Sequence, residues 1–410
     1  MRKNRLYLLK KGNIIVKLLH TSDWHLGQNF MTQSRLEEHQ AFLQWLLTTI
    51  EEKSIDVLLV AGDIFDTATP PNYALELYYN FLIKSSEICK YIIITAGNHD
   101  SIATLKAPKE LLEAINVHVI VSGDIDENEI IPLYEHNELC AIVCAVPFLR
   151  DYVVRKSLSA ELLSEKEYAL TKGIQEHYKK VYKEALALQE YDKEVPIIAM
   201  GHLTTVGASV SDSEREIYIG GTLNVESDFL AKLFDYVALG HLHVNQKVGS
   251  ECVRYSGSPI ALSFNEASSK KYVNLVNFEA KVCKVEKLLI PCARVLKVIR
   301  GCVQEIIEEL EIIEDRRTWI EVHLHDENPF HANEMIRQKA KELHLILLAV
   351  KVEKKQHTLV QDTKKIISLD EVTPLDIFKK RLDKEELGNE ALYKALVEKF
   401  NEVVYEVESL

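Results

Sequence analysis

The chain has 410 residues, with 49 Lys and Arg against 62 Asp and Glu, and its formal net charge is −13 at pH 7. Hydrophobic residues make up 47% and charged residues 27%, which is the balance of an ordinary globular protein. This composition excludes a disordered chain, a collagen-like chain and a polybasic tail protein. The length predicts two or three domains.

The sequence gives no sign of export or of membrane insertion. No apolar run approaches the roughly 18 residues of a membrane span. The seven cysteines include no C-x-x-C pair, which predicts reduced thiols in a cytoplasmic protein. Residues 1–15 are basic around a short Leu-Tyr-Leu-Leu segment, which is too small for a signal peptide. We expect a disordered extension there, and a start of the native protein near Val16 stays open.

From residue 16 to residue 290, short apolar strands alternate with amphipathic helices. The run at 56–61 is apolar almost throughout, as is typical of a strand buried on both faces of a sheet. This alternation predicts an α/β architecture. The expected strands are 16–20, 56–61, 91–96, 140–147, 196–201, 236–240 and 271–278, and the expected helices are 35–52, 72–85 and 159–189.

The pattern of expected strands and helices changes after residue 290. The block 291–355 reads as strand, helix, strand, helix and strand, which predicts a small separate domain after a first domain at 16–290. Residues 356–410 are expected to form a linker and two helices. One face of the last helix carries an apolar stripe, made of Leu392, Leu396, Phe400, Val403 and Val407.

Five polar patches directly follow apolar strands. They are Asp23-Trp-His25, Gly62-Asp63-Ile-Phe-Asp66, Gly97-Asn98-His99-Asp100, Gly201-His202 and Gly240-His241-Leu-His243. Sheets of this class present ligands from the loops at the carboxyl ends of their strands. The D-x-H and H-x-H spacings would place two side chains on the same side of an extended backbone. We therefore expect these patches to meet in one site.

The residue types in these patches point to metal chemistry. Carboxylate, imidazole and carboxamide are ligands of first-row metals, and the lack of a thiolate argues against structural zinc. A single histidine beside a strand is more often structural, but five patches in order favour ligands. Seven ligand side chains are more than one ion needs, and they suit two ions about 3.5–4 Å apart. The candidate ligands are Asp23, His25, Asp63, Asn98, His202, His241 and His243.

The order of these motifs resembles the calcineurin-like metallophosphoesterase family. Longer matches at 20–28, 34–42, 62–67 and 255–259 resemble the bacterial SbcD family of nuclease subunits within it. The resemblance implies a two-sheet metallophosphoesterase sandwich flanked by helices, a small α+β capping domain and a helical C-terminal tail. The family match is most specific over the first 290 residues.

The resemblance also implies how the ligands divide between two divalent ions. Asp63 would bridge them, and the family's usual ion is manganese, with magnesium as the alternative. One position would be held by Asp23, His25, Asp63 and His243, and the other by Asp63, Asn98, His202 and His241.

Three residues beside the ligands receive separate interpretations. In the family pattern, His99 would contact the scissile phosphate and act as a general acid on the leaving oxygen. Asp66 stands where some relatives carry histidine, and we hypothesise that it orients His99 by a hydrogen bond. Asp100 is interpreted as a loop cap without chemistry.

A DNA substrate requires local basic surface, since affinity follows the counterions released at the contact. The acidic balance of the chain predicts that it holds DNA weakly by itself. The candidate basic residues are Arg150, Arg155, Lys156, Lys179, Lys180, Lys247, Arg254, Lys270 and Lys271. The resemblance implies a partner, an SbcC-like SMC-type ATPase bound through the C-terminal helices, and a homodimer within a heterotetramer. The chain has no P-loop motif of its own.

The leading hypothesis is a manganese-dependent nuclease that cuts DNA ends and hairpins. Two alternatives stay open. One is a stand-alone nucleotide phosphodiesterase, against which the 120 residues after the catalytic fold argue. The other is a non-catalytic scaffold, against which the full set of seven ligands argues.

Overall fold

The computed structural model describes residues 15–123, 128–150, 163–189, 193–209, 225–326 and 329–352, together with Leu396, Lys399 and Phe400. The chain divides into two compact units, Met1–Glu353 and Lys354–Leu410. The basic extension expected before residue 15 and most of the helical tail expected at 356–410 lie outside the described residues. Within the described residues, no helix is long and apolar enough to cross a membrane.

The first sheet has six strands in the order β14-β13-β1-β4-β5-β6. Four of them run parallel to their neighbours and two antiparallel strands complete one side. The parallel strands are β1 (Ile15–Thr21), β4 (Val57–Ala61), β5 (Tyr91–Thr95) and β6 (Val117–Ile120), and the antiparallel ones are β13 (Tyr272–Glu279) and β14 (Val282–Leu289).

The second sheet also has six strands, in the order β11-β12-β10-β9-β8-β7. Its four central strands are parallel and both edge strands are antiparallel to their neighbours. The central strands are β8 (Glu138–Ala145), β9 (Ile197–His202), β10 (Tyr236–Gly240) and β12 (Ser250–Tyr255), and the edge strands are β7 (Ile130–Glu135) and β11 (Gln246–Val248).

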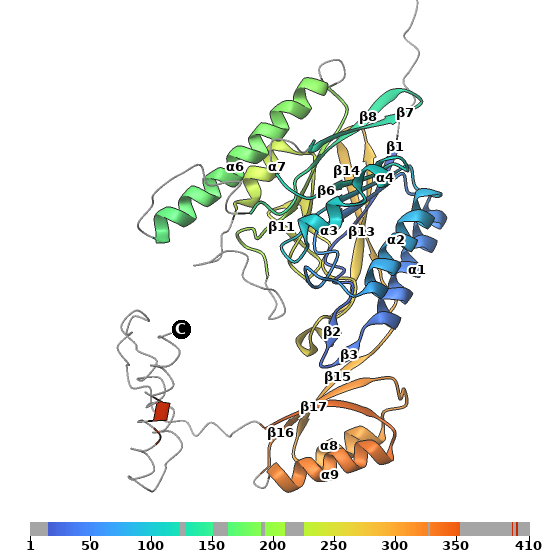
Figure 1. Ribbon diagram of the computed structural model, residues 1–410, viewed down its shortest axis with the longest axis vertical. Coiled ribbons are helices and arrows are strands. Elements are labelled where there is room, and N and C mark those ends of the chain that lie inside the picture. Colours follow the sequence, from blue (N-terminus) through green and yellow to red (C-terminus); the bar gives the residue numbers. More distant parts are fainter. Residues whose placement is uncertain are drawn as a thin grey trace, which may run out of the picture. The chain divides into compact units, whose positions relative to one another are not determined.

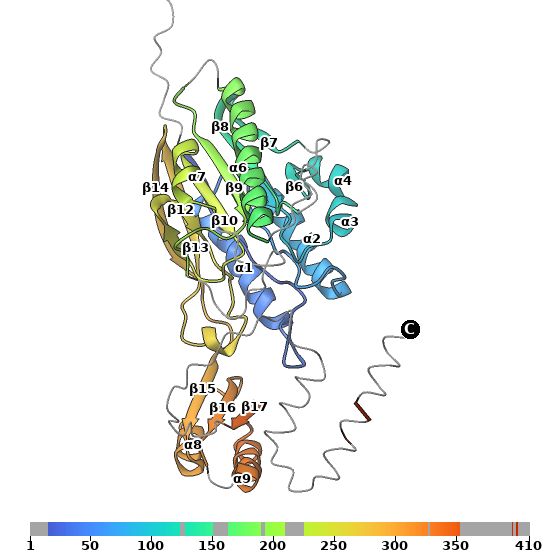
Figure 2. The same cartoon turned by 90° about the vertical axis from the view of Figure 1, so that its left-hand side faces the viewer.

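The two sheets pack face to face and helices cover their outer faces (Figures 1 and 2). Side chains from both sheets form the core between them, including Leu59 of β4 and Ile198 of β9. On the outer faces, α1 (Leu36–Lys53) and α2 (Asn72–Ser86) pack on the first sheet, and α6 (Leu163–Leu188) and α7 (Ser227–Leu233) pack on the second. This arrangement confirms the predicted two-sheet sandwich flanked by helices.

Helix α1 shows why the sequence folds in this way. Its apolar residues Phe42, Leu43, Leu46 and Ile50 recur at the helical period and are buried against the first sheet. Two glutamates occupy its first turn and a lysine its last turn, where they complement the helix dipole. Ser54 ends the helix in a left-handed conformation, with φ of 52°.

A third sheet has three parallel strands in the order β15-β16-β17. Helices α8 (Val303–Glu311) and α9 (Pro329–Glu342) pack on it around a separate hydrophobic cluster that includes Ile306 and Ile336. The alternation of strand and helix is the one expected for the block after residue 290. The strands are β15 (Leu296–Gly301), β16 (Trp319–Leu324) and β17 (Ile346–Val352).

Aromatic and charged side chains join this third sheet to the sandwich. Arg35, only 1% exposed, lies between the rings of Phe30 and Trp319, with its guanidinium carbon 5.1 and 5.2 Å from their centroids. Its guanidinium also donates to the carbonyl of Ala261 at 3.0 Å. Phe30 belongs to a short hairpin of β2 (Asn29–Phe30) and β3 (Gln33–Ser34).

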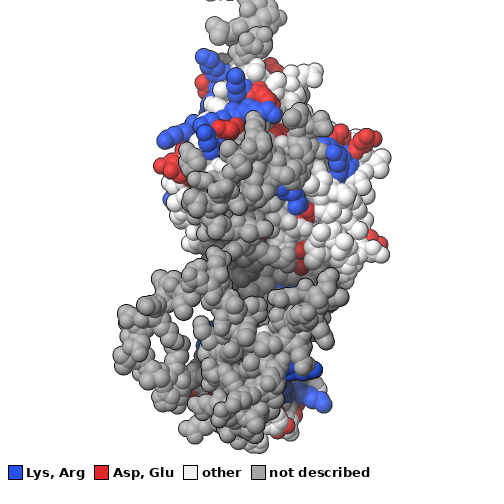
Figure 3. All heavy atoms as spheres, turned by 60° about the vertical axis from the view of Figure 1, so that its left-hand side comes forward, with Lys and Arg blue, Asp and Glu red and all other residues white. Residues whose placement is uncertain are grey.

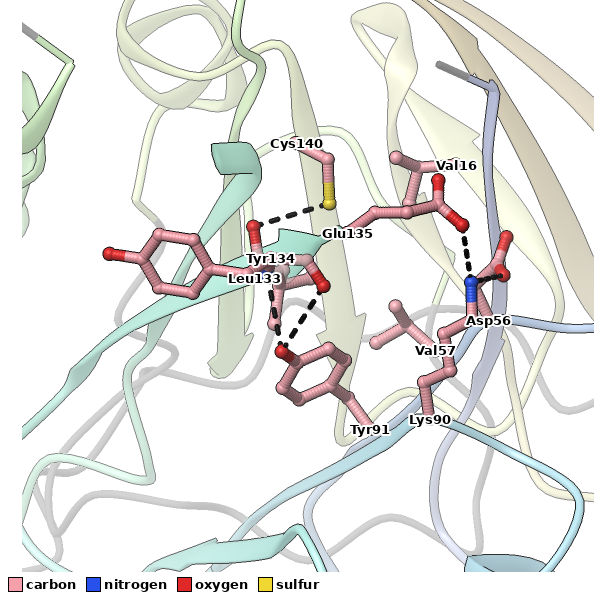
Figure 4. A pocket seen from close by; sticks show the side chains of 9 residues that line it. All are labelled: Val16, Asp56, Val57, Lys90, Tyr91, Leu133, Tyr134, Glu135 and Cys140. Atoms are coloured by element: carbon pink, nitrogen blue, oxygen red, sulfur yellow. Dashed lines mark hydrogen bonds and ion pairs between the residues drawn. The ribbon is translucent and has the colours of Figure 1, made fainter. Parts of the chain in front are cut away.

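At the amino ends of the parallel strands, a small pocket lies between the two main sheets (Figure 4). Lys90 bridges the sheets there, since its amine lies 3.1 Å from a carboxylate oxygen of Asp56 and 2.6 Å from one of Glu135. The hydroxyl of Tyr91 accepts the backbone N–H of Tyr134 at 3.2 Å. These contacts close the sandwich at the end opposite to the polar patches.

All seven cysteines are free thiols, as the sequence predicted. Helices α3 (Ile102–Lys106) and α4 (Lys109–Glu113) complete the first sheet's connections.

Candidate metal centre

The five polar patches meet at one end of the sandwich. The first three follow β1, β4 and β5 of the first sheet, and the other two follow β9 and β10 of the second. The loops after β1 and β4 are joined by backbone hydrogen bonds, from Asp23 N–H to the carbonyl of Gly62 at 3.0 Å and from His25 N–H to that of Asp63 at 3.1 Å. Neighbouring strand ends therefore place their side chains in one small volume.

In three groups of residues, the potential ligand atoms lie within 4.8 Å of one another. The groups are Asp23, His25 and His243; Asp63, His202 and His241; and His25, Asp63 and His99, which shares a residue with each of the other two. The side-chain oxygen of the remaining candidate, Asn98, lies 2.9 Å from Nε2 of His202. The structure thus brings together all seven candidate ligands, and their division between two ions stays a prediction.

Asp63 stands between the first two groups. Its Oδ2 lies 3.3 Å from Nε2 of His202 and 3.7 Å from Nε2 of His25. Its Oδ1 accepts the backbone N–H of His99 at 2.9 Å. This central position is the one that a bridging carboxylate requires.

The backbone of the site differs from the expected one. Four residues of the site have positive φ, a region that residues other than glycine rarely adopt. They are Asp23 (53°), His25 (46°), Asp63 (50°) and His241 (95°). The expectation that D-x-H and H-x-H lie on an extended backbone is therefore wrong. Tight turns after the strands direct these side chains, and such conformations are typical of functional sites.

Glycines allow the loops to approach one another closely. A Cβ on Gly97 would lie 2.1 Å from Oδ1 of Asp63, and one on Gly62 would lie 2.2 Å from Nδ1 of His202. A Cβ on Gly240 would lie 1.8 Å from the carbonyl oxygen of Ala61. The glycine before each of these patches is thus required by the space that the ligands occupy.

Burial and neighbouring charges set the protonation of the ligands. Burial lowers the pKa of His202, but the charge of Asp63 and its hydrogen bond outweigh burial and raise that pKa to about 9. Burial raises the pKa of Asp63, but His202 and His25 outweigh it and hold the pKa well below its usual value. Without a metal ion, His202 is therefore protonated at neutral pH and pairs with the charge of Asp63. Binding of a cation by these residues would release this proton.

Asp66 makes the hydrogen bond to His99 that was expected from the sequence, through its backbone carbonyl. Its carboxylate Oδ1 lies 3.3 Å from Nδ1 of His25, whereas Nδ1 of His99 lies 2.8 Å from its backbone carbonyl oxygen. Asp66 therefore orients His99 through its main chain, and its side chain faces His25. With Nδ1 donating to this carbonyl, Nε2 of His99 is the nitrogen available to a substrate.

Asp100 caps the loops, as the sequence suggested. Its carboxylate accepts backbone N–H groups of Gly97, Phe65 and Ile64 at 2.8, 3.0 and 3.2 Å. Burial, followed by the charge of Asp63, raises the pKa of Asp100 to about 6. This carboxylate holds the loops after β4 and β5 together and has no ligand role in the two groups.

The donor set fits divalent cations. It consists of imidazole nitrogens and carboxylate or carboxamide oxygens, which suit manganese, magnesium, iron or catalytic zinc. Nε2 of His25 is buried and has no hydrogen-bond partner among the described residues. A buried imidazole nitrogen without a partner is costly unless a cation completes its coordination. Both positions have the chemistry that such an ion needs.

Two buried residues of the site were not identified as such from the sequence. Glu266 and Lys271 lie behind His243, and their carboxylate and amine are 2.5 Å apart. Neither follows a parallel strand, so no strand-end pattern marks them. Lys271 was expected on a DNA-binding surface, but it is only 10% exposed.

Other basic candidates are also engaged within the chain. Arg254 is buried and pairs with Glu251 at 2.7 Å. Arg150 donates to the carbonyl of Asp100 at 3.0 Å. Arg155 and Lys156 lie outside the described residues.

Comparisons with known proteins identify the family of the chain. The family model described as calcineurin-like phosphoesterase matches residues 16–245, and the one described as type 5 capsule protein repressor C-terminal domain, SbcD_C, matches residues 292–386. The SbcD component of the SbcCD nuclease from Escherichia coli (strain K12) is 38% identical over 91% of this chain and 94% of its own length.

Two further relatives carry the same name. The protein of Bacillus subtilis (strain 168) is 32% identical over 75% of this chain and 79% of its own length. The protein of Rhodobacter capsulatus is 36% identical over 64% of this chain and 66% of its own length. The chain therefore belongs to the calcineurin-like phosphoesterase family, in the branch of the SbcD components of SbcCD nucleases.

Proposed function

We propose that this chain is a manganese-dependent nuclease that degrades duplex DNA ends as a 3′–5′ exonuclease and cuts hairpins and single strands as an endonuclease. The observation that carries the proposal is the position of Asp63 between two groups of N and O ligands, with His99 bound to it through its backbone N–H. The relatives named as nucleases support DNA as the substrate.

The residues of the chain divide the chemistry between them. When bound, two divalent ions would supply an acidified water and neutralise charge on the phosphate oxygens. Asp63 would hold both ions, and the two sets of histidines would fix their separation. His99 is partly exposed, and its Nδ1 is taken by the carbonyl of Asp66. As a general acid, His99 would carry a proton on both ring nitrogens, with Nδ1–H donating to that carbonyl and the Nε2 proton passing to the leaving oxygen.

The role of His99 has a direct test. His99→Ala is expected to lower DNA cleavage by about 10²–10⁴-fold, because the alkoxide leaving group needs a proton. An aryl phosphodiester leaves as a stable phenolate, so its hydrolysis should fall by less than about tenfold. Both rates are measured with Mn²⁺ at one pH. Equal losses on the two substrates would contradict the general-acid role and indicate a defect in metal binding.

The surface charge of the chain supports the need for a partner. Figure 3 shows Lys and Arg gathered at the upper end of the face drawn, interspersed with Asp and Glu. On α6, Lys180 lies 4.0 Å from Glu184, so the charge of this lysine is partly neutralised locally. Mixed charge of this kind binds DNA weakly.

We infer that an SbcC-type SMC-like ATPase, bound through residues 356–410, supplies ATP hydrolysis and additional basic surface, in a heterotetramer built on a homodimer. The family match that extends to residue 386 supports this use of the C-terminal part. Co-purification with such an ATPase, and stimulation of Mn²⁺-dependent cleavage of duplex DNA by ATP, test the assembly. Rapid hydrolysis of small nucleotide diesters without any cleavage of DNA by the complex would instead favour a nucleotide phosphodiesterase.

A further inference from the structure

A buried carboxylate lies directly behind one proposed ligand. Glu266 ends the short 3₁₀ helix η1 (Phe264–Glu266) and is 2% exposed. Its Oε1 lies 3.7 Å from Nδ1 of His243. Its Oε2 accepts the amine of Lys271 at 2.5 Å and the backbone N–H of Leu262 at 3.2 Å. The position of this carboxylate is therefore fixed from two sides.

Lys271 connects this carboxylate with the backbone of the ligand itself. Its amine also donates to the carbonyl of His243 at 3.2 Å and to the hydroxyl of Ser258 at 2.8 Å. Burying an ammonium and a carboxylate costs free energy unless each is fully bonded, and here the lysine makes three hydrogen bonds. The side chain of Lys271 thus holds both the backbone of His243 and the carboxylate of Glu266, which faces the His243 ring.

The two proposed cation positions differ in what lies behind their histidines. In the first, Nδ1 of His243 faces Glu266 and Nδ1 of His25 faces the carboxylate of Asp66 at 3.3 Å. In the second, Nδ1 of His202 lies 3.0 Å from the backbone carbonyl oxygen of Ala61. A carboxylate behind a ligating histidine fixes its tautomer and raises its basicity more than a neutral carbonyl does.

We propose that Glu266, held by Lys271, is a positioning residue for His243, and that the position formed by Asp23, His25 and His243 is the tighter of the two. With Nδ1 directed to Glu266, Nε2 of His243 is the nitrogen left for the ion. The negative charge behind both histidines strengthens their attraction for a cation. This inference rests on the proposed two-cation function.

The test is Glu266→Gln in the full chain, titrated with Mn²⁺ at one pH. Isothermal calorimetry gives the number and affinity of the ions, and electron paramagnetic resonance distinguishes an isolated ion from a coupled pair. Gln keeps the size and the acceptor for Leu262 but removes the charge. The Kd of the tighter ion is expected to rise about 10–100-fold, with the weaker ion's Kd changed less than about threefold.

Two further variants sharpen the test. Lys271→Met removes the amine that holds Glu266 and the His243 carbonyl in position. It is expected to weaken the same ion through lost positioning, whereas tighter binding would show that only charge acts on this ion and would contradict the role of Lys271. Glu279→Gln is the matched control, because Glu279 is an exposed carboxylate paired with Lys284 at the far end of β13, and it should leave both ions unchanged. If Glu266→Gln does not fold by circular dichroism, Glu266→Asp, which keeps the charge but withdraws it from His243, takes its place.

The outcomes separate this inference from the function on which it rests. Unchanged affinity of the tighter ion in Glu266→Gln, or equal weakening of both ions, would overturn the inference. Wild-type protein that binds fewer than two Mn²⁺ ions would overturn the proposed function itself.

Discussion

The charge of Asp63 is expected to control cation binding at the site, because this carboxylate is close to histidines of both groups. Its pKa lies well below the usual value, since His202 and His25 outweigh the effect of burial. Asp63→Asn keeps the shape and removes the charge. We expect it to abolish coupled binding of two Mn²⁺ ions and to lower cleavage at least about a thousandfold. Calorimetry and cleavage of an aryl phosphodiester measure the two effects.

Asp66→Asn provides the comparison for that variant. Its carboxylate faces His25, at 3.3 Å from Nδ1, so we expect a loss of about 10–100-fold in the affinity of one ion. For Asp63→Asn, binding of two Mn²⁺ ions with wild-type affinity would contradict the role of Asp63 as the bridge between the ions.

At the scale of residues, the sequence identified the candidate ligands that the structure brings together, but not the groups that orient them. The ligands stand in short motifs beside glycines, and each motif can be found locally. The contact between Glu266 and His243 joins residues 23 positions apart, and no spacing rule marks it. The hydrogen bond between Asp66 and His99 was expected, but its use of the backbone carbonyl of Asp66 could not be predicted, because the fold of the loop sets the direction of that carbonyl.

At the scale of elements, β4 and β10 come close at the end that carries the site. A Cβ on Gly240 would lie 1.8 Å from the carbonyl oxygen of Ala61 and 2.9 Å from Nδ1 of His202. Gly240→Ala must therefore push the two sheets apart at the ligands. We expect a loss of about 3 kcal/mol in the free energy of unfolding, and weaker Mn²⁺ binding. Urea unfolding measures the first effect.

Gly207→Ala is the matched control for this change. No heavy atom lies within 4 Å of the added Cβ, although φ is +84°. Backbone strain alone should cost about 1 kcal/mol and leave Mn²⁺ binding intact. Equal losses in the two variants would show that close approach at Gly240 is not the cause.

The elements that the sequence predicted are those whose burial leaves a strong pattern. Strand β4 is buried along its whole length and appears as an unbroken apolar run. Edge strands β7 and β14 were missed because their patterns are weaker. Pro132 interrupts β7, which an edge strand tolerates, and β14 is largely exposed with several charged residues. Pairing of β14 with β13 is visible only in the folded sheet.

At the scale of the whole molecule, a buried histidine makes stability depend on pH. Burial, followed by the charges of Arg35 and His25, lowers the pKa of His39 to about 3. In the unfolded chain this pKa is about 6.5. Between these values the unfolded state binds more protons, so the free energy of unfolding falls as pH falls, by up to about 1.4 kcal/mol per pH unit.

His39→Leu should remove this contribution. Urea unfolding of the metal-free protein between about pH 6 and pH 4 compares the two slopes. The variant is expected to lose stability less steeply than wild type. Identical slopes would show that His39 is protonated in the folded state.

Metal removal is the last prediction at this scale. Binding of ligand to the folded state stabilises it by about 2.7 kcal/mol per site when the free ion is at 100 times its Kd. We expect EDTA to lower Tm by several degrees relative to saturating Mn²⁺, measured by calorimetry. Asp63→Asn should show a clearly smaller difference between the two conditions than wild type, and an undiminished difference would contradict the assigned role of Asp63.

The division of the ligands between the sheets has a consequence for synthesis of the protein. Asp23, His25, Asp63 and Asn98 follow strands of the first sheet, whereas His202, His241 and His243 follow strands of the second. A nascent chain that has emerged only as far as the first sheet's parallel strands therefore lacks three ligands. The full set is present only after more than half of the polypeptide has left the ribosome, so shorter translation products cannot assemble the centre.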